Sequence, residues 1–155
     1  MDRPLVDVAA GEAHLPTRWP DVGGSTLLDE LAVQATLARY CHRCDDADFA
    51  GVVALFTPDG VLTHGDRSVR GPEALLEYFQ SMQGRPEQRG RHLMGNVVVR
   101  SDGDVARSIS DYVFFRFGSR GLVPAIVGRY HDELVRLGGE WRIARRDAMR
   151  LNTPA

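Results

Sequence analysis

The sequence predicts a single α+β domain in which a strongly curved antiparallel sheet wraps around three helices and leaves an enclosed pocket. At 155 residues the chain is long enough for about one domain with one hydrophobic core. Apolar residues recur at helical spacing in the first half, and four long segments rich in Val, Ile, Phe and Tyr follow in the second. Strands of that length twist and curl, so the helices can fill the concave side of the sheet.

The two ends of the chain lack the pattern of a folded element. Pro and Gly recur without a sustained period in residues 1–24, which predicts an irregular N-terminal arm. We therefore expect the folded domain to span residues 25–150 and a short C-terminal tail to follow at 151–155.

Three helices and a small hairpin are expected before the long strands. Apolar spacing predicts a first helix over about 27–44 and a second over 49–56, with Asp48 as the N-cap of the second. A hairpin is expected over 61–70, and Pro opens a third helix over 72–82.

The four long strands follow a charged loop at 84–90, which we expect to be mobile. They are expected at 91–100, 104–117, 122–136 and 140–150, separated by short Gly-containing turns. Consecutive strands joined by such short turns form an antiparallel meander.

Composition excludes several classes of function. The 19 basic and 21 acidic residues give a formal charge of -2 without a long basic run, which argues against nucleic acid and membrane surfaces. No basic segment precedes an apolar run at the N-terminus and no apolar stretch is long enough to span a membrane, so we expect a cytoplasmic protein. No paired His and carboxylate spacing, GxSxG, GxGxxG or Walker loop is present, so we expect no metal site, serine nucleophile or nucleotide cofactor. Cys41 and Cys44 lie within a helical pattern and are interpreted as packing residues.

Asp45 and His92 are the candidate catalytic residues. Asp45 follows Cys41 by one helical turn and Ala38 by two, so the phase of the first helix places it on the buried side. His92 opens the first long strand on a face that mixes polar and apolar groups. A carboxylate bonded to one imidazole nitrogen fixes the tautomer and orients the other nitrogen as a general base. The alternatives are a His92 bonded to a backbone carbonyl and an Asp45 that caps the second helix, a role that Asp48 fills more naturally.

Further candidates for contacting a substrate are aromatic, amide or thioether side chains expected on inward faces. Tyrosine hydroxyls and the Asn amide can donate a hydrogen bond to a developing oxyanion. These candidates are Tyr40, Met94, Asn96, Tyr112, Phe114 and Tyr130.

The chain resembles the SnoaL-like branch of the nuclear transport factor 2-like superfamily over about residues 25–150. The resemblance is carried by the order and spacing of short motifs. They are Arg39-Tyr40, Asp45, Asp48-Phe49, Leu55-Phe56, Asp59-Gly60, Gly71-Pro72, Arg91-His92, Asn96, Asp102-Gly103-Asp104, Gly128-Arg129-Tyr130, Asp132, Gly138-Gly139, Trp141 and Ile143.

The resemblance implies a cone-shaped α+β fold around a deep pocket that needs no metal or organic cofactor. Relatives include scytalone dehydratase, hexachlorocyclohexane dehydrochlorinase, limonene epoxide hydrolase, ketosteroid isomerase and polyketide cyclases. In the dehydratase and the dehydrochlorinase, an aspartate ending the first helix holds a histidine that removes a proton, and those positions match Asp45 and His92. The second histidine of the fungal dehydratase falls near Gly118 and has no counterpart. Structural small subunits of ring-hydroxylating dioxygenases resemble the same superfamily.

Three hypotheses about function follow. The first is a lyase or isomerase, dehydratase-like, that acts without a cofactor on a small hydrophobic cyclic or polyketide-like substrate. The second is a non-catalytic ligand-binding or subunit-like module, which expects Asp45 and His92 to lie too far apart for a hydrogen bond or the pocket to be filled by side chains. The third is an aldol-type polyketide cyclase that uses the same pair. By analogy with the family we also expect a homodimer.

Overall fold

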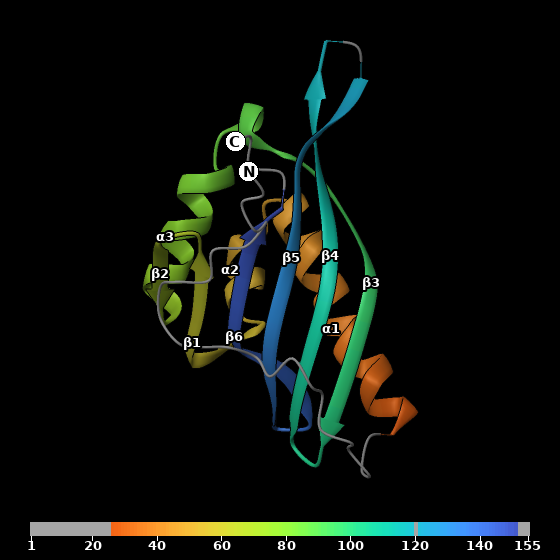
Figure 1. Cartoon of the computed structure of the whole chain (residues 1–155). Helices are drawn as coiled ribbons and strands as arrows, with labels where there is room; N and C mark the ends of the chain where they lie inside the picture. Colours follow the sequence, from red (N-terminus) through yellow and green to blue (C-terminus); the bar gives the residue numbers. More distant parts are fainter. Residues whose placement is uncertain (1–25, 120, 152–155) are drawn as a thin grey trace, which may run out of the picture.

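The computed structural model describes residues 26–119 and 121–151. The predicted arm at 1–24 lies outside the described residues, as does the predicted tail except for Leu151. Within the described residues the chain forms three α-helices, one short 3-10 helix and six strands (Figure 1). The helical elements are α1 (Leu27–Asp45), α2 (Phe49–Val53), α3 (Pro72–Gln83) and η1 (Pro86–Gln88). The strands are β1 (Phe56–His64), β2 (Arg67–Arg70), β3 (Gly90–Asp102), β4 (Val105–Gly118), β5 (Gly121–Leu137) and β6 (Glu140–Arg150).

The predicted fold class is confirmed: one curled sheet packs against three helices. The strand order is β2-β1-β6-β5-β4-β3, and the four long strands form the predicted antiparallel meander. One pairing differs from an all-antiparallel sheet, because β1 runs parallel to β6. Parallel neighbours need a long connection, and the chain between β1 and β6 supplies it with α3 and four strands.

The second helix is shorter than the sequence suggested. It ends at Val53, and β1 begins at Phe56, where the sequence pattern predicted a continuing helix. The reason is tertiary: the backbone N–H of Ile143 donates to the carbonyl of Leu55 at 2.8 Å, and Phe56 pairs with Ile143. A register shift between Phe56 and Val61 keeps residues 57–60 within the strand.

The core lies between α1 and the concave face of the sheet. Thr26 caps α1 by accepting a hydrogen bond from the Asp29 N–H at 3.1 Å. The helix then buries an apolar stripe that faces β3 and β6, while α3 covers β1 and β2 (Figure 1). The stripe consists of Val33, Leu37, Tyr40, Cys41 and Cys44. Its spacing continues to Asp45, which places a carboxyl group at the end of an apolar face.

Two bulges change which residues face the core. In β3 the register shifts between Gly95 and Val98, and Asn96 has a φ of 50°. In the β5–β6 pair the register shifts between Glu133 and Leu134. An extra residue in one strand reverses the alternation of inward and outward side chains beyond it. The first bulge turns Asn96 outward, and the second turns Arg146 inward.

Candidate functional site

Asp45 is held in place by the end of α1. The Asp46 N–H donates to the His42 carbonyl at 2.9 Å, and Ala47 then adopts a positive φ of 59° that turns the chain away. Asp48 caps α2 by accepting from the Gly51 N–H at 2.9 Å, as the sequence predicted. The Asp45 carboxylate therefore has no part in capping either helix.

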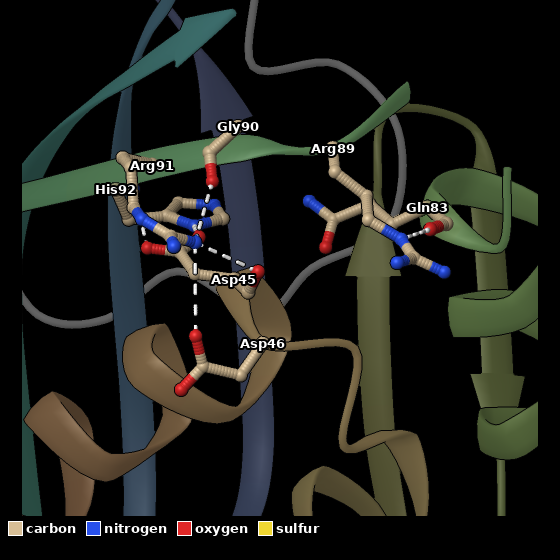
Figure 2. Close-up of polar contacts among 7 residues, drawn as sticks. All are labelled: Asp45, Asp46, Gln83, Arg89, Gly90, Arg91 and His92. Atoms are coloured by element: carbon tan, nitrogen blue, oxygen red, sulfur yellow. Dashed lines mark hydrogen bonds and ion pairs between the residues drawn. The ribbon is translucent and has the colours of Figure 1, made fainter. Parts of the chain in front are cut away.

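The structure brings Asp45 and His92 together (Figure 2). One carboxylate oxygen of Asp45 lies 2.6 Å from His92 Nδ1, and the other accepts from the His92 backbone N–H at 2.8 Å. Both side chains are more than nine-tenths buried. The carboxylate thus holds the strand backbone and the ring at once, which leaves the imidazole little freedom to rotate.

This contact defines the chemistry available to His92. A carboxylate oxygen accepts, so Nδ1 carries the proton of the neutral ring and Nε2 is left as an acceptor. Among the described residues no group hydrogen-bonds Nε2. The ring packs 4.7 Å from the Phe114 ring, centroid to centroid, and 6.0 Å from that of Tyr112. A basic nitrogen surrounded by aromatic rings can take a proton from a bound molecule.

Arg91 provides a further contact between β3 and the C-terminal end of α1. Its Nη1 donates to the Asp45 carbonyl at 2.8 Å and lies 3.7 Å from an oxygen of Asp46 (Figure 2). The guanidinium is half exposed, so its electrostatic contribution is screened by water. Its role is to satisfy a terminal helix carbonyl beside the buried pair.

His92 lies in the wall of a cavity of about 90 Å³. Four of the predicted substrate-contacting residues line the same cavity, and burial places them on inward faces. They are Tyr40, Tyr112, Phe114 and Tyr130. Gly128, which pairs with Tyr112, makes room for the Tyr112 ring, because a Cβ at that position would collide with it.

The cavity tyrosines are hydrogen-bond donors at neutral pH. Burial raises the pKa of Tyr40 and Tyr130 well above the ordinary value and also raises that of Tyr112. The rings of Tyr112 and Tyr130 stack 4.2 Å apart. Protonated phenols on an apolar wall can donate to an oxygen that gains charge.

Met94 and Asn96 do not line this cavity. Met94 packs against the hydrophobic core. Asn96 is exposed on the bulge of β3, where its amide donates to Asp111 at 3.0 Å. Strict alternation from His92 placed both residues in the pocket, and for Asn96 the bulge explains the difference.

A second pair, formed by a carboxylate and a basic side chain, lies beneath the cavity. Arg146 on β6 donates from Nε and Nη2 to the two oxygens of Asp132 on β5, at 2.7 and 2.9 Å, and both side chains are completely buried. Ser108 donates to the same carboxylate at 3.2 Å. Burial alone lowers the pKa of Arg146, but the charge and hydrogen bonds of Asp132 outweigh it and hold this pKa above the ordinary value.

His64 and Tyr78 also line the cavity, and the sequence did not single them out for it. His64 Nδ1 lies 2.6 Å from the Tyr78 hydroxyl, which brings β1 and α3 together. Both residues also line an adjoining groove of about 590 Å³. The hydrophobic spacing of α3 could have indicated an inward Tyr78, but its pairing with His64 requires the tertiary structure.

The two cysteines are free and buried. Burial raises the pKa of Cys41 to about 11 and that of Cys44 as well, so neither is a thiolate at neutral pH. Among residues 26–119 and 121–151, no group of three His, Cys, Asp or Glu is placed to hold a metal ion. In the same part of the chain no helix is both long and apolar enough to cross a membrane.

The curled sheet, the three helices on its concave side and the cavity between them are the architecture of nuclear transport factor 2-like, cystatin-like proteins. An NTF2-like protein of Novosphingobium aromaticivorans has the same fold, with a TM-score of 0.75 at 24% identity over 83% of this chain and 86% of that one. The chain belongs to the SnoaL-like domain family, whose sequence profile matches residues 25–147.

Two mycobacterial relatives are more similar in sequence. The uncharacterized protein Rv2910c of Mycobacterium tuberculosis is 32% identical over 125 residues, which cover 76% of this chain and 82% of the relative. The structure of a variant of Rv3472, a protein of unknown function from the same organism, has 34% identity and a TM-score of 0.75, covering 79% of this chain and 72% of that one. A N. aromaticivorans protein provisionally named a scytalone dehydratase shares the fold at 18% identity, with a TM-score of 0.72 over 80% of this chain and 85% of that one.

Proposed function

We propose that this protein is a lyase or isomerase, dehydratase-like, that removes a proton from a small hydrophobic cyclic or polyketide-like molecule. His92 is the general base and Asp45 orients it. The observation that carries the proposal is the 2.6 Å contact between Asp45 and His92 Nδ1 in the wall of an aromatic cavity. The chemistry needs only side chains, because a neutral imidazole can take a proton from carbon and return it elsewhere.

The size and lining of the site suit a small hydrophobic molecule. The cavity of about 90 Å³ shares five lining residues with the groove of about 590 Å³, so a ligand can extend from His92 into the groove. The shared residues are His64, Tyr78, Met82, Ala148 and Arg150. Rings that stack or pack edge to face favour planar cyclic ligands.

The observed geometry argues against the binding-module hypothesis but does not distinguish the aldol-type cyclase from a lyase or isomerase. The binding-module hypothesis expects either that Asp45 and His92 are too far apart for a hydrogen bond or that side chains fill the pocket. The 2.6 Å separation argues against the first expectation, and the cavity of about 90 Å³ argues against the second. The aldol-type cyclase hypothesis uses the same pair on an acidic carbon and differs only in the substrate. The dehydratase-like neighbour shares only the fold, yet its name fits a dehydratase or isomerase role.

Proton exchange at carbon tests the proposal without knowledge of the natural substrate. The probe is 2-tetralone, a small bicyclic ketone, whose α-protons are followed by ¹H NMR in D₂O with the whole protein. We expect faster exchange than with an equal concentration of free imidazole. His92→Ala should slow the exchange on the order of 10²–10⁴-fold, the usual contribution of a positioned acid or base.

A matched variant controls for the loss of an imidazole. His131 is half-buried on β5 and does not line the cavity, so His131→Ala should exchange 2-tetralone at the normal rate. Circular dichroism checks that both variants are folded. A folded His92→Ala protein with normal exchange refutes the assignment of the base, as does a wild-type protein that is no faster than imidazole.

The homodimer stays a prediction. One row of apolar side chains crosses the outer face of three neighbouring strands, since Leu93 pairs with Val113 and Val113 with Val127. Leu93 and Val127 are both exposed. Such a row is compatible with a partner copy.

A further inference from the structure

His64 and Tyr78 form a second polar cluster in the same cavity as His92, and Arg150 completes it. His64 Nδ1 lies 2.6 Å from the Tyr78 hydroxyl, and Arg150 Nε donates to His64 Nε2 at 3.3 Å. All three residues line the cavity and the adjoining groove. The cluster thus lies where the narrow and the wide parts of the site meet.

The direction of the hydrogen bonds follows from Arg150. A guanidinium N–H can only donate, so His64 Nε2 is the acceptor and the ring proton of neutral His64 lies on Nδ1. That N–H donates to the oxygen of Tyr78. The Tyr78 hydroxyl proton is therefore not used by His64 and is free to be donated to a ligand.

The environment keeps both groups in the required state. Burial, assisted by the Arg150 charge, lowers the pKa of His64, which favours the neutral ring. Burial raises the pKa of Tyr78 to about 12, although the charge of Arg67 opposes this. Tyr78 therefore keeps its proton near neutral pH and acts as a donor.

The charges around the cavity favour an anionic oxygen. None of the described residues that line it is acidic, whereas Arg116 and Arg150 both contribute to the lining. The Asp45 carboxylate lies behind the ring of His92 and is not part of the lining. An oxygen that gains negative charge would meet donors and cations there, and no like charge.

We propose that Tyr78 is a second catalytic residue, whose hydroxyl donates to the substrate oxygen that gains negative charge when His92 removes a proton. The proposal rests on the proposed function and narrows its substrate to carbonyl compounds with an acidic neighbouring C–H. The C–H bond breaks and its proton forms a bond with His92 Nε2. The released electron pair forms a C=C bond, and the carbonyl π electrons move to oxygen, giving an enolate that Tyr78 holds. Imidazolium His92 then returns the proton in one of two ways. It protonates a carbon of the enolate, or it protonates an oxygen that leaves from the neighbouring β-carbon. In the second case the C=O bond re-forms, the C=C bond shifts to the α and β carbons, and the bond from the β-carbon to that oxygen breaks.

Binding of 2-naphthol tests this placement, because its anion resembles the enolate of 2-tetralone. Absorbance of the naphtholate measures the ionised fraction of bound and free ligand over a range of pH. We expect bound 2-naphthol to ionise at a lower pH than free 2-naphthol. Tyr78→Phe should weaken 2-naphtholate binding on the order of tenfold or more, as expected for a hydrogen bond to a charged group, and should leave 2-methylnaphthalene binding unchanged within about twofold.

The positioning role of His64 has a matched pair of variants. His64→Gln keeps an N–H that can donate to Tyr78 and should retain most of the preference for naphtholate. His64→Leu has no donor and should lose much of it. Equal behaviour of the two variants shows that His64 only fills space and overturns this part of the proposal.

Outcomes for Tyr78 are separable from those for His92. Naphtholate binding requires no proton removal from carbon. In a His92→Ala background, Tyr78→Phe should therefore still lower the affinity for 2-naphtholate. Suppose that His92→Ala exchanges 2-tetralone at the normal rate and that Tyr78→Phe still weakens naphtholate binding. The role of His92 as base is then rejected, while the role of Tyr78 as oxyanion donor stands. The proposal for Tyr78 is overturned if Tyr78→Phe weakens both ligands equally, if it weakens neither, or if wild-type protein does not favour naphtholate.

Discussion

Two buried carboxylates among the described residues, Asp45 and Asp132, hold a basic partner, and they do so in opposite ways. Asp132 and Arg146 are completely buried and joined by two parallel hydrogen bonds. Asp45 binds the His92 ring through one oxygen and the His92 backbone N–H through the other, at the wall of a cavity. A guanidinium never releases its proton in a protein, whereas an imidazole titrates near neutrality. The first pair is therefore a permanent charge that shapes the site, and the second can change its charge during a reaction.

The permanent pair orders the aromatic wall of the cavity. The Arg146 guanidinium carbon lies 3.9 Å from the centre of the Tyr40 ring and 4.2 Å from that of Tyr130. Both rings line the cavity, and Tyr130 stacks on Tyr112. A buried cation that lies over two rings gains cation–π attraction from each of them. Asp132 and Arg146 thus act on the site through the tyrosines.

The largest expected effect comes from breaking the permanent pair. Arg146→Met leaves the Asp132 carboxylate buried without its partner, which should lower the free energy of unfolding by about 3–5 kcal/mol. Urea unfolding followed by circular dichroism measures it. The double variant Asp132→Leu/Arg146→Met removes both charges and should recover most of the loss.

An exposed pair provides the control for that measurement. Arg107 and Glu133 lie 3.7 Å apart across β4 and β5 with both side chains about two-fifths exposed. Arg107→Ala should cost no more than about 1 kcal/mol, because water screens such pairs. A loss in Arg146→Met as small as that of Arg107→Ala would falsify the view that Arg146 neutralises a buried charge.

Removing the charge of Asp45 without changing its shape is the next largest perturbation. In Asp45→Asn the amide oxygen can still accept from the His92 backbone, but the amide N–H₂ now faces Nδ1 and donates to it. The ring proton should therefore move to Nε2, which removes the base. ¹⁵N NMR of His92 reports the tautomer directly, and the free energy of unfolding should fall by only about 1–2 kcal/mol, as for one altered hydrogen bond.

Asp46 is the matched control for this substitution. It is the next residue in the chain, it is exposed, and its side chain contacts Arg91 at 3.7 Å. Asp46→Asn should leave the tautomer of His92 unchanged. If Asp45→Asn also keeps the proton on Nδ1, the orienting role assigned to Asp45 is wrong.

The same contrast shows what the sequence could predict. Asp45 lies in phase with the buried stripe of α1, and His92 lies before the bulge of β3, so helical and strand periodicity place both correctly. Asn96 and Arg146 lie at or beyond a bulge, where alternation reverses. Bulges depend on pairing between strands, and no local sequence pattern indicated either of these two bulges. The Asp132–Arg146 pair was therefore invisible in the sequence, although the two residues are direct neighbours across β5 and β6.

The fold class was predictable for a related reason. Long alternating segments and short turns specify the meander from local information alone. The parallel pairing of β1 with β6 joins segments about eighty residues apart in the chain, as the Leu62–Arg146 pairing shows, and it has no counterpart in local turn chemistry. The shortening of α2 has the same origin, since β6 draws Phe56 into the sheet.

Replacing His131 gives the smallest expected effect. Its imidazole can be compared with that of His92, because no carboxylate among the described residues forms a hydrogen bond with it. Burial lowers its pKa below the ordinary value of 6.5 and Arg129 adds to this, while Asp147 and Asp132 oppose it. Between the folded and unfolded pKa values the unfolded chain binds more protons, so this contribution to stability is present above 6.5 and is lost as the pH falls below it. His131→Gln should match wild type within about 0.5 kcal/mol near pH 8 and should lose less stability than wild type on acidification, measured by urea unfolding at several pH values. An equal loss in both proteins means that His131 keeps an ordinary pKa despite its burial.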